Sequence, residues 1–175
     1  MKQFSSIKPI EIMQDGKAVG AKDISVTSVF KHETKFFFAQ EMIKANTLEI
    51  VRPLAEIKFH KQNDDSPLWR ENFNYELEIK PFGIFSLWGN HHIEVVSIDE
   101  AATTIVTREK NDVCTIWNHT LTFNKTADNE TEYTDRIIFY AGKPTNFLAS
   151  FLVYSYKKRY RNWDKLLKKI KAGKV

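Results

Sequence analysis

Apolar residues recur in steps of three and four along the last long segment of the chain, residues 146–171. This spacing places them on one face of an α-helix. No proline or glycine interrupts the segment, and Gly173 stands where a helix would end. Charges recur through its second half, so it is too polar to cross a membrane. The pattern predicts one long helix with an apolar face made by Leu148, Leu152, Tyr156, Tyr160, Trp163, Leu167 and Ile170.

Between residues 55 and 140 the dominant period is two, which is the pattern of a strand with one buried face. The alternation predicts strands over residues 55–59, 73–80, 87–98, 103–109, 115–124 and 131–140. Polar turns such as Asn111-Asp112 and Asp128-Asn129 separate the later strands. Consecutive strands joined in this way form an antiparallel meander, which has to curl or be covered to hide its apolar face.

The chain before residue 55 is less regular. Residues 24–30 alternate as a half-buried strand, whereas residues 33–51 predict one or two short helices. Asp15-Gly16 is a turn signal, and residues 9–12 predict a short strand before it. The whole pattern predicts an α+β fold, in which a curved antiparallel sheet of about seven strands wraps on the long C-terminal helix. We expect a single domain over residues 1–175, with a core from about 23 to 171 and an N-terminal extension, residues 1–22, for which the pattern specifies no firm structure.

Polar residues on the apolar face of a strand carry the most information about function. Side chains alternate along a strand, and this places His91, His119 and Asp135 on faces that otherwise consist of core residues. Thr107 and Glu109 join them from the strand between the two histidines. A buried carboxylate without a partner is costly, so Asp135 needs one, and a histidine is suitable.

Three interpretations of these polar residues stay open. In the first, they form a hydrogen-bonded network in the core or at a barrel rim. In the second, they orient an apolar guest in a ligand cavity. In the third, they perform chemistry. The chemistry would be His-Asp acid–base catalysis, or metal binding by two histidines and a carboxylate. No nucleophile motif, phosphate loop or zinc-ligand spacing is present. His91 and His92 cannot both bind one metal from a straight strand, because they point to opposite faces.

Composition adds two expectations. Aromatic residues make up 13% of the 175 residues, and such large flat side chains fill cores and also line cavities for apolar ligands. Cys114 is the single cysteine, which excludes an intramolecular disulfide and favours a reducing compartment. The first twelve residues lack the apolar run of a signal peptide, so we expect a cytoplasmic protein.

Positive charge is concentrated in the predicted C-terminal helix. Residues 146–171 contain eight lysines and arginines against Asp164 alone, a net charge of +7, which leaves −3 for the rest of a chain whose total is +4. Basic amphipathic helices bind nucleic acid or anionic membranes, but they also occur as solvated outer faces. We expect a solvated face and no nucleic-acid binding, because no aromatic or glycine pattern of an RNA-binding module accompanies the charge. Peripheral membrane contact through this helix is an alternative.

The order of elements and several local sequences resemble the START-like superfamily with the helix-grip fold, also called SRPBCC, which includes polyketide cyclase and plant pollen-allergen branches. The resemblance covers about residues 23–170. Its local sequences are Gly83-Ile84, Trp88-Gly89-Asn90-His91-His92-Ile93-Glu94, Thr107-Arg108-Glu109, Trp117-Asn118-His119-Thr120, Tyr133-Thr134-Asp135-Arg136-Ile137 and Trp163 with its preceding arginines. The resemblance implies a deep cavity between sheet and helix that holds lipids, sterols, polyketides or other apolar molecules. Leu121 stands where relatives carry a further histidine, which weakens a transfer of metal or catalytic roles.

We therefore predict a domain that binds a hydrophobic small molecule without transforming it, with no cofactor, metal or catalytic residue. The predicted apolar pocket wall consists of Phe59, Tyr75, Ile93, Trp117, Ile137, Phe151 and Tyr156. The predicted polar end consists of His91, Glu109, His119 and Asp135. One alternative is a cyclase, dehydratase or hydrolase that uses His119 or His91 as a base. Another is an interaction protein that acts through its basic helix. Nothing in the sequence specifies an oligomeric state.

Overall fold

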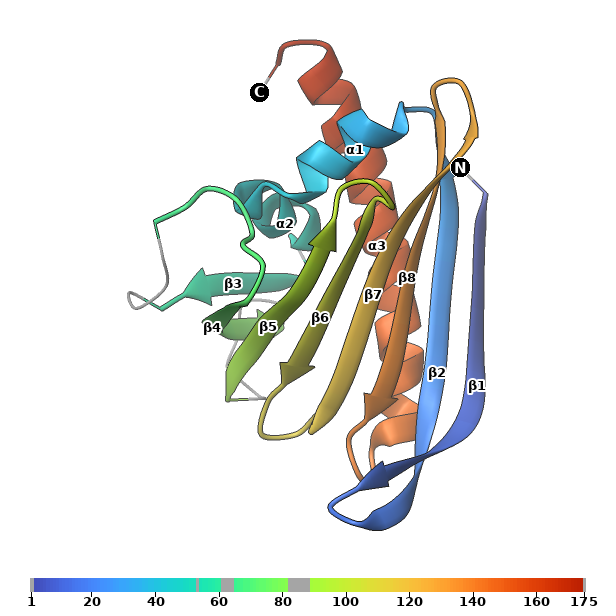
Figure 1. The fold of residues 1–175 in the computed structure, drawn as a ribbon, viewed down its shortest axis with the longest axis vertical. Coiled ribbons are helices and arrows are strands. Elements are labelled where there is room, and N and C mark those ends of the chain that lie inside the picture. Colours follow the sequence, from blue (N-terminus) through green and yellow to red (C-terminus); the bar gives the residue numbers. More distant parts are fainter. Residues whose placement is uncertain (1, 53, 61–64, 82–88, 175) are drawn as a thin grey trace.

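A curved antiparallel sheet wraps around one long helix in the computed structural model, which describes residues 2–52, 54–60, 65–81 and 89–174. The long helix, α3 (Thr145–Lys171), lies across the concave face of the sheet (Figure 1). Two short helices, α1 (Thr34–Glu41) and α2 (Lys44–Val51), lie beside the C-terminal half of α3. The predicted α+β architecture is confirmed.

Within the described residues the sheet has eight strands, and each pairs with its neighbours in antiparallel orientation. They are β1 (Gln3–Gln14), β2 (Lys17–Phe30), β3 (Ala55–Phe59), β4 (Phe73–Pro81), β5 (Asn90–Asp99), β6 (Thr104–Lys110), β7 (Ile116–Ala127) and β8 (Glu130–Tyr140). The spatial order is β1-β2-β8-β7-β6-β5-β4-β3. β2 therefore pairs with β8, the last strand of the meander, and β1 lies at the edge beyond it. The predicted meander is confirmed. Leu87 and Trp88, predicted at the start of the fourth strand, lie outside the described residues.

The N-terminal residues form a full strand of the sheet, which corrects the prediction of an extension with a short strand at residues 9–12. β1 pairs with β2 along its whole length. Asp15 and Gly16 join the two strands with backbone φ angles of 50° and 75°. Two positive φ angles in a two-residue loop give the tight turn that matches the twist of a hairpin, and a glycine adopts one of them without strain. β1 is the eighth strand, where about seven were predicted.

The core lies between the concave face of the sheet and α3. The predicted apolar face of α3 is buried from Leu148 to Leu167, and Ile170 at its end is half-buried. Trp163 is fully buried, and its ring lies 5.3 Å from that of Phe37 on α1. The hydroxyl of Tyr160 donates a hydrogen bond of 2.7 Å to the carbonyl of Val26 on β2. Aromatic packing and this buried hydrogen bond therefore determine how α3 sits on the sheet.

A cavity with an apolar wall and a buried polar network

A cavity of about 180 Å³ lies between the concave face of the sheet and the helices. Strands β3 to β7 supply one wall, and α1, α2 and α3 supply the other. Most of the lining is aliphatic or aromatic. The polar side chains in the wall are Glu41, Thr47, His91, Thr107, Glu109, His119, Ser155 and Arg159.

The structure brings most of the predicted site residues to this cavity. Phe59, His91, Ile93, Glu109, Trp117, His119, Phe151 and Tyr156 line it. Tyr75, Asp135 and Ile137 do not line it, although all three are buried. Tyr75 packs against Trp69, with ring centroids 4.8 Å apart, and Asp135 lies behind His119. These three residues therefore lie outside the lining of this cavity. A role in ligand binding stays a prediction for all eleven residues.

His119 is held between two carboxylates. Its Nε2 lies 2.7 Å from Asp135 Oδ1, and its Nδ1 lies 3.2 Å from Glu109 Oε1. Both partners are acceptors, so both ring nitrogens carry protons and the ring is a cation. Burial opposes this charge, but the hydrogen bonds and charges of Asp135 and Glu109 outweigh burial and raise the pKa of His119 to about 9.

The hydrogen bonds of His91 specify its tautomer. The side chain of Asn111 is oriented by the backbone N–H groups of Val113 and Cys114, which donate to its Oδ1 at 3.0 and 2.7 Å. Its amide nitrogen therefore donates to His91 Nδ1, at 3.1 Å. The ring proton of His91 is thus on Nε2, which donates to Glu109 Oε2 at 2.9 Å.

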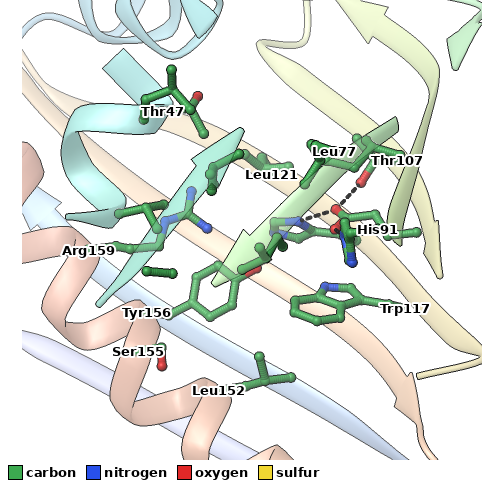
Figure 2. A pocket seen from close by; sticks show the side chains of 18 of the residues that line it. Thr47, Leu77, His91, Thr107, Trp117, Leu121, Leu152, Ser155, Tyr156 and Arg159 are labelled. Carbon is green, nitrogen blue, oxygen red and sulfur yellow. Dashed lines mark hydrogen bonds and ion pairs between the residues drawn. The ribbon is translucent and has the colours of Figure 1, made fainter. Parts of the chain in front are cut away.

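Glu109 connects the two histidines. Thr107 donates a further hydrogen bond of 2.7 Å to Glu109 Oε1 (Figure 2). Burial alone would favour the neutral acid, but the hydrogen bonds from His119 and His91 outweigh burial and hold the pKa of Glu109 far below its usual range. Every ring nitrogen of the two histidines is consequently occupied by a partner, and His119 is already protonated. A general base needs a free lone pair aimed at the substrate, which neither histidine offers in this arrangement.

Comparisons with known proteins agree with this architecture. No family model and no curated protein matches the sequence. A START superfamily protein from Mycobacterium smegmatis superimposes with a TM-score of 0.63 over 85% of this chain and 98% of its own, at 10% identity. The chain has the START-like fold. Norcoclaurine synthase from Thalictrum flavum also has a TM-score of 0.63, at 10% identity over 85% of this chain and 87% of its own. A major latex-like protein from Panax ginseng has a TM-score of 0.58, at 10% identity over 83% and 96% of the two chains.

In this START-like domain the structure adds two charged residues that sequence reasoning did not assign to the site. Arg159, which we counted with the solvated basic face of the helix, lines the cavity with its side chain only 13% exposed. Glu41 on α1 lines it as well and is 4% exposed. Helical spacing could have predicted the inward position of Arg159. It lies three residues after Tyr156 and four before Trp163, which places it on the same face of the helix as both. Burial of the Glu41 carboxyl raises its pKa to about 7 against the opposing charge of Arg159.

The described part of the chain contains no group of three or more His, Cys, Asp or Glu side chains placed to hold a metal ion. None of its helices combines the length and the apolar character that crossing a membrane requires.

Proposed function

We propose that the cavity binds a compact apolar molecule, for carriage or sensing, and that the protein does not transform it. The proposal rests on a mostly apolar cavity in which the histidines and Glu109 are bonded within the protein. His91 and His119 hydrogen-bond to Glu109, and His119 also bonds to Asp135, so these groups are not aimed at a guest. A few polar groups in an apolar concave wall are typical of small-molecule sites.

Cavity size narrows the class of ligand. An apolar cavity of about 150 Å³ accommodates benzene, and this one measures about 180 Å³. A molecule with one ring or a short chain therefore fits, whereas a whole lipid, sterol or polyketide requires the cavity to widen. The solved norcoclaurine synthase structure is a complex with dopamine and hydroxybenzaldehyde, both single-ring molecules, and this supports a ligand of the same scale here.

Saturable binding of about one small aromatic molecule per chain is the expected result of titrating the protein with indole or 2-phenylethanol in a calorimeter. Bound ligand should also raise the melting temperature, because it stabilises only the folded state. The change Ile93→Trp fills the cavity and should abolish binding. Tyr154→Trp, on the exposed side of α3, is the matched control and should leave binding unchanged. Absence of saturable binding across a broad set of small apolar molecules would refute the proposal.

Exchanging Lys165 and Lys168 together for glutamine should change the free energy of unfolding by less than ~0.5 kcal/mol for each residue. Both side chains are exposed, and Lys168 contacts only the neighbouring Asp164 of its own helix among the ion pairs of the described residues. Such surface pairs contribute little. The measurement is urea denaturation of the two proteins.

The same double variant tests the interaction alternative. Anionic vesicles and oligonucleotides are titrated at low and at physiological salt. We expect no binding at physiological salt, because exposed charges are largely screened there. Binding that persists at physiological salt and disappears in the double variant would show that the basic face has a partner.

A further inference from the structure

Among the described residues of the cavity wall, Arg159 is a cation without a hydrogen-bonded anionic partner. Arg159 Nη2 lies 3.9 Å from Glu41 Oε1, which is beyond hydrogen-bonding distance. Its Nε has no hydrogen-bond partner within the described residues. The guanidinium lies over the ring of Tyr156, 4.6 Å from the centroid. Figure 2 shows it extending from α3 toward the interior of the cavity.

A second hydrogen-bond donor lines the same cavity. Ser155 lines the cavity one turn before Arg159 on α3, and its Oγ is buried without a hydrogen-bond partner in the described part of the chain. Buried polar groups in folded proteins are nearly always paired, so two unpaired groups in the wall of one cavity indicate that a guest completes their bonds. The histidine network has no such deficit at its ring nitrogens, because these pair with Glu109, Asp135 and Asn111.

From this arrangement we propose that the ligand is a compact apolar monocarboxylic acid whose carboxylate binds Arg159 and accepts a hydrogen bond from Ser155. The inference rests on the proposed function and specifies its ligand. A planar guanidinium matches a carboxylate well, and hydrogen bonds between charged partners are stronger than neutral ones. The apolar body would occupy the space between Trp117, Ile93 and Phe151.

Glu41 is the group that responds to this carboxylate. Arg159 and Trp163 from α3, His119 from β7 and Asp135 from β8 act on it. Because its pKa is about 7, Glu41 exchanges a proton close to neutrality. Its protonated form leaves Arg159 free for the guest, whereas its charged form competes for the guanidinium and repels an anion. Affinity for the acid should therefore fall as the pH rises from 6 to 8, a range in which His119 stays largely protonated.

The test compares three guests of similar size, phenylacetate, 2-phenylethanol and 2-phenylethylamine, by calorimetry at pH 6 and pH 8. At pH 6 the protein should bind phenylacetate ~10-fold or more tightly than the alcohol, the expected effect of a partly buried charged hydrogen bond. Arg159→Gln should remove this preference while 2-phenylethanol still binds. Glu41→Gln should remove the loss of phenylacetate affinity between pH 6 and 8. Arg161→Gln, which changes an exposed arginine of the same helix, is the matched control and should retain the preference.

The outcomes separate this inference from the proposed function. Equal binding of the three guests, tightest binding of the amine, or an acid preference that survives Arg159→Gln would overturn the carboxylate proposal and leave the apolar site intact. Absence of binding by all three would count against both. If Arg159→Gln fails to fold because Glu41 is then buried without a cation, the double variant Glu41→Gln/Arg159→Gln removes both charges. It should fold, bind the alcohol and show no preference for the acid.

Discussion

Replacing Trp163 with alanine is expected to lower the free energy of unfolding by ~3–5 kcal/mol, the usual cost of emptying a large buried aromatic site. Trp163 is fully buried where α3 crosses the sheet. Its ring contacts Phe37 edge-on, and Phe37 in turn contacts Phe123 and Tyr133. The substitution would therefore remove apolar burial and loosen the contact between α1, α3 and two strands at once. Urea denaturation followed by circular dichroism measures the change.

The matched control is Tyr154→Ala, which removes a large aromatic residue from the same helix. Its side chain is about half exposed, and the residue does not line the cavity. Surface substitutions of this kind usually change stability by about 0.5 kcal/mol or less. A similarly small change for both variants would mean that the burial of Trp163 contributes little to stability. That result would contradict the packing described here.

Raising the pH from 6.5 to 9 should lower the free energy of unfolding by ~2–3 kcal/mol through His119 alone. The pKa of His119 rises from an ordinary value of 6.5 to about 9 in the folded protein, so the folded state retains a proton that the unfolded state has lost. Its contribution is fully present below pH 6.5 and is lost as the pH rises through about 9. Glu109 has the opposite pH dependence, because its pKa is lowered in the folded protein. Its contribution to the free energy of unfolding is lost as the pH falls, and it disappears only in strong acid. Chemical denaturation at half-unit pH steps gives the curve.

Two variants assign the pH dependence to individual residues. His119→Gln should be less stable below about pH 9, because it leaves Glu109 and Asp135 without their shared cation. Above pH 7.5 its stability should change little with pH. Glu41→Gln should remove only the loss of stability that occurs as the pH rises from about 4.5 to 7. In this range the folded state keeps the Glu41 carboxyl protonated, because burial raises its pKa from 4.5 to about 7, whereas the unfolded state loses the proton. A wild-type slope above pH 7.5 that persists unchanged in His119→Gln would refute the assignment.

Periodicity in the sequence predicted the meander, the long C-terminal helix and the inward direction of His91, His119 and Asp135. It predicted only residues 9–12 of β1, whose twelve residues are mostly exposed and alternate poorly. β1 is stable because its backbone pairs with β2 along its whole length, and such long-range pairing leaves little trace in the pattern of side chains. The same limit applies to Tyr75 and Ile137, since alternation indicates the face of a strand and not whether that face borders a cavity or packed core.

The sequence by itself determined the type and order of the elements, because the period of apolar residues differs between helix and strand and each period needs one buried face. It also determined which polar residues point inward. Only the tertiary structure decided what those residues do. His119 is a cation, and not a base, because two strands bring Glu109 and Asp135 to its two nitrogens from 10 and 16 residues away. Arg159 belongs to the cavity because α3 packs with its Tyr156 and Trp163 face inward, which places Arg159 opposite Glu41. Charge state and ligand chemistry arise from distances between separate elements, and a linear pattern contains no such distances.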